Sequence, residues 1–214
     1  MIQNSNLQIP RETCLKLVEK YVFPEGRPHL FYTEAAMAAL ARYFNEVEPG
    51  SEDEHTWAMA GLLHDIDYEQ ITGKENMDAH MREHCGPLTE KFLKEIDFPD
   101  DLIRAIQSHN EVQNIARDSR LAQALFAVDG LTGFIVAVSK IIPDKQISSV
   151  KVESVIKRFK EKRFAAAVNR EHILTCETEL GIPKEKFVEM ALGAMKRVNY
   201  EFDLGINLNF LCPK

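Results

Sequence analysis

Several histidines and aspartates of this 214-residue chain are spaced so that they could act together as metal ligands. The stretch WAMAGLLHDID, residues 57–67, is an apolar helical run in which His64 and Asp65 stand side by side near the end. His64 falls on the same helix face as Trp57 and Gly61, and this face should point at the core. A carboxylate in a core is costly unless it is paired or bound to a metal. The dipeptide therefore predicts a buried polar site at the end of this helix.

Other predicted helices carry the same kind of residue into the core. Asp129 stands in the middle of the apolar segment 120–142, where no Lys or Arg of the same helix can reach it. His29, His84 and His109 each fall on the inward stripe of a different helix. Taken singly, each histidine is more simply a core residue that hydrogen-bonds to a carbonyl or hydroxyl group. Four imidazoles and two carboxylates in one core instead predict a site for Fe, Mn, Co, Ni or Zn.

Helical periodicity runs through nearly the whole chain, and no alternating β pattern is longer than a few residues, so the predicted class is all-α. The expected helices cover about 11–23, 28–47, 51–65, 84–96, 99–110, 120–142, 148–162, 166–180 and 183–202. Residues 11–145 should form a metal-binding helical core, and residues 146–204 a C-terminal helical extension packed on it as part of a single globular unit. His80 should lie outside the helix that starts near His84, which makes it a weaker candidate ligand.

The bulk composition limits the partners of the chain. A net charge of -7 and a pI of about 5.6 disfavour binding to nucleic acid polymers or anionic lipid. A mean hydropathy of -0.25 and an apolar run confined to residues 131–138 argue against a membrane protein. No secretory signal is visible, so a cytoplasmic location is expected. No C-x-x-C pair occurs, and ordinary reduced thiols are expected at Cys14, Cys85, Cys176 and Cys212.

The order of the candidate ligands, H, then HD, then two further H, then D, resembles the HD-domain superfamily of metal-dependent phosphohydrolases. The motif is supplied here by His29, His64, Asp65, His84, His109 and Asp129. The runs HCGPLTEKFL and AIQSHNE resemble the segments with the third and fourth histidines of that family's five-helix core, and the resemblance covers about residues 14–142. Over its whole length the chain is similar to a small HDIG-like group of stand-alone predicted HD hydrolases.

The resemblance implies two divalent transition metals per chain, Fe or Mn first, with Ni, Co or Zn as alternatives. Asp65 would bridge the metals. His29, His64 and Asp129 would complete the first site, and His84 and His109 the second. If these last two histidines point elsewhere, the other four residues would hold a single metal.

The implied activity is hydrolysis of a phosphoester or phosphoanhydride bond in a small, nucleotide-like phosphorylated substrate by a metal-activated water. Some relatives use the same ligands as di-iron oxygenases, and a non-catalytic nucleotide-binding module would keep the fold without chemistry. Both stay open as alternatives.

Residues around the motif each have two interpretations. Asp67 stands where many HDIG-type members have Gly, and it either accepts a hydrogen bond from a ligand histidine or faces water. Glu111, two residues after His109, has the same two interpretations. Tyr68 or Glu69 stands where some members have a lysine, which puts a catalytic lysine in doubt.

The C-terminal extension is locally basic, in contrast to the rest of the chain. Its residues could fold over the metals and hold the substrate phosphate, or they could form a solvated helix face. The candidates are Lys140, Lys151, Arg163 and Arg170. His55 and His172 are expected to be exposed to solvent.

Overall fold

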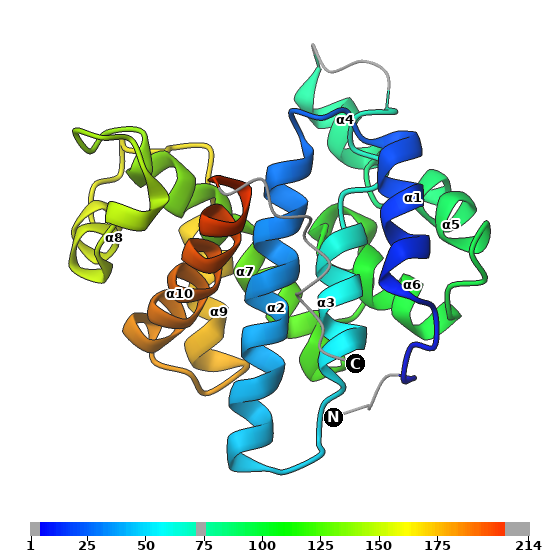
Figure 1. The fold of residues 1–214 in the computed structure, drawn as a ribbon. Helices are drawn as coiled ribbons and strands as arrows, with labels where there is room; N and C mark the ends of the chain where they lie inside the picture. Colours follow the sequence, from blue (N-terminus) through cyan, green and yellow to red (C-terminus); the bar gives the residue numbers. More distant parts are fainter. Residues whose placement is uncertain (1–4, 72–75, 204–214) are drawn as a thin grey trace.

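Helices make up the regular structure of the computed structural model, which describes residues 5–71 and 76–203 (Figure 1). In chain order they are α1 (Arg11–Tyr21), α2 (Arg27–Val47), α3 (Glu54–Leu63), α4 (Met77–Glu83), α5 (Pro87–Lys94), α6 (Asp100–Gln107), α7 (Arg120–Ser139), α8 (Val152–Phe159), α9 (Arg170–Thr178) and α10 (Lys184–Asp203). Short 3-10 turns at Glu111–Gln113 (η1) and Ile147–Ser149 (η2) join some of them. No strand occurs in the described residues, so the predicted all-α class is confirmed.

Helices α2 and α3 pack against each other at the centre of the fold (Figure 1). The carboxylate of Asp53 begins α3 by accepting a 2.7 Å hydrogen bond from the amide of Thr56. Every residue of α3 from Thr56 to Leu63 is buried. His64 caps the C-terminal end of this helix, so the apolar run carries the histidine into the interior.

Gly61 allows the close approach of α3 to α2. A Cβ atom at this position would lie 2.8 Å from the carbonyl oxygen and 2.9 Å from the carbonyl carbon of Thr33. Both atoms belong to the backbone of α2, so they cannot move aside without moving the helix. The contact sets the spacing between the helices that carry His29 and His64.

Replacing Gly61 with alanine should therefore lower the free energy of unfolding by about 1–3 kcal/mol, the usual cost of overpacking a core. For a chain of this size, each kcal/mol corresponds to roughly 2–4 °C in Tm, which calorimetry can measure. Gly193→Ala is the matched control, because nothing lies within 4 Å of a Cβ atom built there. Equal Tm values for the two variants would contradict the close contact.

Helix α7 crosses the core and carries Asp129 in its middle. The side chain of Ser119 accepts a 3.2 Å hydrogen bond from the amide of Ala122 and caps the helix. By length and composition alone α7 could cross a membrane, although the apolar run noted in the sequence covered only residues 131–138. In the structure, however, 67% of its most apolar window is buried inside the protein. Its hydrophobicity is therefore that of a core helix.

The helices after residue 146 pack on the same core. Helix α10 contacts α2 and α7, while α8 and α9 both contact α7 (Figure 1). One cluster of buried side chains extends from Leu7 to Val198 and includes residues of both predicted parts. The division into 11–145 and 146–204 stays a prediction, and residue 204 and Cys212 lie outside the described residues.

The predicted start of a helix near His84 is wrong, whereas the helix itself is present as α5. His84 instead caps the C-terminal end of α4, and His80 lies inside this helix and is buried. Cys85 then adopts a left-handed conformation (φ 60°), and α5 begins at Pro87. The sequence signals at Gly86 and Pro87 marked the start of α5 correctly, but the polar segment before them concealed a separate helix.

Candidate metal centre

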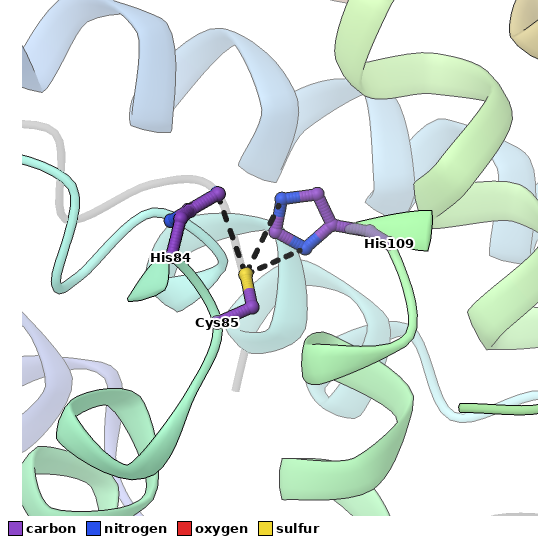
Figure 2. A group of neighbouring side chains, drawn as sticks. All are labelled: His84, Cys85 and His109. Carbon is purple, nitrogen blue, oxygen red and sulfur yellow. Dashed lines mark hydrogen bonds between the residues drawn. The ribbon is translucent and has the colours of Figure 1, made fainter. Parts of the chain in front are cut away.

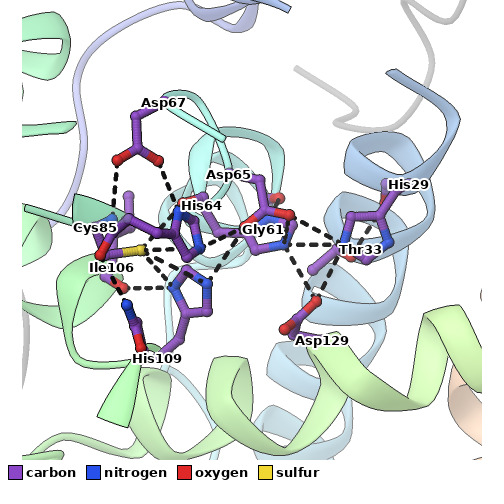
Figure 3. Close-up of polar contacts among 12 residues, drawn as sticks. His29, Thr33, Gly61, His64, Asp65, Asp67, Cys85, Ile106, His109 and Asp129 are labelled. Carbon is purple, nitrogen blue, oxygen red and sulfur yellow. Dashed lines mark hydrogen bonds and ion pairs between the residues drawn. The ribbon is translucent and has the colours of Figure 1, made fainter. Parts of the chain in front are cut away.

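Six predicted ligands from separate parts of the chain meet in one place (Figure 3). The first turn of α2 supplies His29, the end of α3 supplies His64 and Asp65, and the middle of α7 supplies Asp129. The ends of α4 and α6 bring His84 and His109. The folding of five helices therefore assembles the set that the sequence singled out.

One oxygen of the Asp65 carboxylate faces the first group of ligands. Its Oδ2 lies 3.5 Å from Nε2 of His29 and 3.4 Å from Nε2 of His64. Oδ1 of Asp129 lies 3.0 Å and 3.4 Å from the same two nitrogens. The ligand atoms of these four residues lie within 4.8 Å of one another, a grouping that could hold a metal ion.

The other oxygen of Asp65 faces the second group. Its Oδ1 lies 3.3 Å from Nε2 of His84 and 3.4 Å from Nε2 of His109. These are the separations expected between neighbouring ligands about 2.0–2.1 Å from a shared ion. One carboxylate thus has its two oxygens directed at two different pairs of histidines, which is the geometry of a bridging ligand.

The opposite nitrogen of each imidazole has an acceptor of its own. Nδ1 of His64 donates to the carbonyl oxygen of Gly61 at 2.8 Å, and Nδ1 of His109 donates to that of Ile106 at 2.7 Å. Nδ1 of His29 lies 3.3 Å from the hydroxyl of Thr132. Such partners fix the tautomer that leaves the Nε2 lone pair free for a metal.

Asp67 is the partner of His84. Its Oδ1 accepts from Nδ1 of His84 at 2.9 Å, and its Oδ2 accepts from the amide of Cys85 at 2.9 Å. The residue is fully buried, so it does not face water. Two donors converge on two carboxylate oxygens, and the carboxylate thereby orients His84 and stabilises the left-handed turn at Cys85.

Asp67→Asn should weaken the binding of a metal at His84 by about 10–100-fold, the usual effect of losing such a partner. Asparagine offers one acceptor oxygen to two donors, so either His84 or the Cys85 amide loses its bond. Binding isotherms of Mn²⁺ or Co²⁺ measured by calorimetry provide the test. The site at His29 is the internal control, and equal weakening of both sites would contradict this role.

The surrounding histidines favour the charged form of the carboxylates. Burial alone would lower the pKa of His29, but hydrogen bonds with Asp129 and Asp65 outweigh it and raise the pKa to about 10. Burial alone would raise the pKa of Asp65, but His64 and the hydrogen-bonded histidines hold it well below its usual range. Burial alone would also raise the pKa of Asp129, but hydrogen bonds with His29 and His64 lower it. Both aspartates are thus ionised at neutral pH, and bound cations would take the place of the histidine protons.

Cys85 lies beside the second group of ligands, as Figure 2 shows. Its Sγ is 3.4 Å from Nε2 of His84 and 3.7 Å from Nε2 of His109, and the residue is completely buried. His84, Cys85 and His109 form a further group that could hold a metal. Sequence reasoning treated this thiol as ordinary, although its position next to His84 was a signal. A sulfur donor would favour Zn, Co or Fe over Mg.

A cavity of about 880 Å³ opens onto five of the six ligands, all but the fully buried His64. One wall comes from α4, which sequence reasoning did not predict, and another from residues 167–169 and His172 of the C-terminal part. His172 and His55 were both predicted to be exposed to solvent, and their contacts correct these two predictions. His172 lines the cavity and pairs with Glu111 at 3.3 Å, and Nε2 of His55 lies 2.7 Å from the carbonyl oxygen of Ile9.

Glu111 has a largely exposed side chain at the cavity, where it forms an ion pair with His172. The basic candidates are not brought to the cavity at all: none of the four lines it. The guanidinium of Arg170 instead donates to backbone carbonyls that include those of Phe159 and Glu161. Lys140, Lys151 and Arg163 are exposed. The geometry gives their predicted role in phosphate binding no support.

A family model described as HD domain matches residues 29–133. The match begins at the first candidate ligand and ends four residues after the last, so it includes all six. Neither the curated proteins nor the solved structures contain a match to the chain.

Proposed function

The chain belongs to the HD-domain family, which generally comprises metal-dependent phosphohydrolases, and we propose that it hydrolyses a phosphoester or phosphoanhydride bond of a small phosphorylated substrate. The observation that carries the proposal is the placement of Asp65. Its two oxygens face two separate pairs of histidine Nε2 atoms. This arrangement fits two divalent ions, with His29, His64 and Asp129 on one and His84 and His109 on the other.

The charge of such a centre suits a phosphate group. Two divalent ions against the carboxylates of Asp65 and Asp129 leave about two positive charges, which attract a phosphate dianion. When bound, the ions would supply a water of lowered pKa and polarise the phosphoryl oxygens. The buried residues hold this charge in place: His64 has no exposed side-chain surface, and His84 and His109 are 4% exposed.

The more open side of the centre faces the cavity. His29 and Asp129 have side chains that are 32% and 33% exposed, so a substrate would approach from their side. Tyr68 and Asn110 also line the cavity and could orient a substrate by hydrogen bonds. The fold thus supplies a rigid base of histidines and an accessible face for the phosphoryl group.

Phosphate release from phosphomonoesters, nucleotides and dinucleoside polyphosphates, measured with protein loaded with Mn²⁺ or Fe²⁺, tests the proposal. We expect turnover of at least one class and none by the metal-free protein. Absence of turnover across the panel by protein that contains both metals would contradict it. Substrate-dependent oxygen uptake by the iron form would instead support the di-iron oxygenase, and tight binding of an unreacted nucleotide would support a non-catalytic module.

A further inference from the structure

The cavity is much larger than a phosphate group requires. Its volume of about 880 Å³ lies within the range of roughly 300–1,000 Å³ in which pockets enclose organic ligands. A phosphoryl group on the metal centre would fill only its base. The remaining space must suit the part of the substrate to which the phosphate is attached.

Much of that space is bounded by apolar side chains. Met77 and Met81, one helical turn apart on α4, line the cavity together with Val112 of η1. Met77 is 56% and Val112 51% exposed, which places both among the few large apolar side chains on the surface of the described residues. Exposed apolar groups gathered at the entrance of a pocket indicate that a ligand covers them.

A flat side chain adds to this surface. The ring of His172 packs on that of Phe126 with 4.3 Å between centroids and a tilt of 32°. The guanidinium of Arg117 lies 3.7 Å from the centroid of Phe126, and Nε2 of His172 is held by Glu111. These contacts fix the His172 ring, so it offers a rigid planar surface for an aromatic or apolar group.

The charged side chains that line the cavity would repel a second phosphate group of the substrate. Apart from the proposed metal ligands, the described lining residues carry carboxylates at Glu69, Asp78 and Glu111 and a guanidinium at Arg82. The cavity beyond the metals is therefore net negative. A chain of phosphates extending away from the metal centre would meet carboxylates, whereas a neutral group would not.

We propose that the substrate is a phosphomonoester whose alcohol part is a bulky, uncharged and largely apolar group of about nucleoside size, lying against Met77, Met81 and His172. This inference rests on the proposed function and narrows it to one class of substrate. Water adds its oxygen to phosphorus, the bond from phosphorus to the ester oxygen breaks, and a proton from the water ends on the alkoxide. The products are the free alcohol and inorganic phosphate.

Two matched comparisons of kcat/KM test the two halves of the proposal on the metal-loaded protein. Comparing adenosine 5′-monophosphate with adenosine 5′-triphosphate varies the charge of the substrate, while the alcohol part, adenosine, stays the same. 2-(1-Naphthyl)ethyl phosphate against glycerol phosphate varies the alcohol at a constant charge, and both esters release an alkoxide. We expect the monophosphate and the naphthylethyl ester to be favoured at least about tenfold each, and calorimetry should detect binding of adenosine but not of glycerol.

The variant Asp78→Asn,Glu111→Gln should raise the ratio of triphosphate to monophosphate kcat/KM by roughly threefold or more, because two like charges are removed from the path of the longer anion. Glu153→Gln, an exposed change on α8 away from the cavity, should leave the ratio as it was. Met81→Asp should weaken adenosine binding.

Preferred hydrolysis of the triphosphate or of glycerol phosphate would overturn this inference and leave the proposed function standing. Absence of hydrolysis of all four compounds by protein with both metals would overturn this inference, and the proposed function would fall with it only if the dinucleoside polyphosphates of the wider panel were not hydrolysed either. An unchanged ratio in the double variant would show that the carboxylates of the lining do not select the substrate.

Discussion

Asp65→Asn is expected to lower kcat/KM for phosphate release by at least about a thousandfold. The asparagine keeps one carbonyl oxygen, but its amide nitrogen must face either the His29 and His64 pair or the His84 and His109 pair. One metal therefore loses a ligand and the centre loses a negative charge. Since bound metals contribute several kcal/mol to stabilising the transition state, and about 1.4 kcal/mol corresponds to tenfold in rate, a thousandfold loss is the smallest expected effect.

The substitution is nearly isosteric, so circular dichroism should show an unchanged helical content. Asp118→Asn removes the same charge from an exposed position and should leave the activity within about twofold. An Asp65→Asn protein that retains more than a tenth of the wild-type kcat/KM would contradict the bridging role.

Removal of the metals by a chelator is expected to abolish activity and lower Tm while leaving the protein folded. An ion that binds only the native state at a thousandfold excess over its Kd stabilises that state by about 4 kcal/mol. For a chain of this size the loss corresponds to roughly 8–16 °C in Tm for each site. The metal-free centre stays paired, because His29 bonds to Asp129 and His84 to Asp67. The apoprotein should therefore unfold cooperatively at the lower temperature.

Differential scanning calorimetry with and without chelator measures this shift, and added Mn²⁺ or Fe²⁺ should restore both Tm and activity. Asp65→Asn should respond much less to the same treatment. A Tm that is insensitive to chelator in wild-type protein would show that the histidines and aspartates serve the fold without a metal.

The six candidate ligands could be found from the sequence because helical periodicity reports which side chains face the core. Asp129 was recognised as unpaired within its own helix, and His29, His64 and His109 lay on inward stripes. A buried carboxylate or imidazole needs a partner, so several of them on different helices implied a common site. The structure brings them together as expected.

Features of the structure that depend on packing between distant segments could not be predicted from helical periodicity. Helix α4 is short and polar, and burial of His80 depends on neighbours that periodicity does not reveal. The pairing of Asp67 with His84 joins residues that are 17 apart in the chain. The segment after residue 163 does approach the cavity, but through Ala167, Val168 and Asn169 and not through its basic residues.

The number of metal ions bound per chain tests the proposed centre most directly. Elemental analysis by mass spectrometry of extensively dialysed protein should give two ions per chain for the wild type. It should give one for His109→Ala, because this variant removes a ligand from the second group and leaves His29, His64, Asp65 and Asp129 intact. One ion per chain in both proteins would contradict the two-metal centre with Asp65 as its bridge.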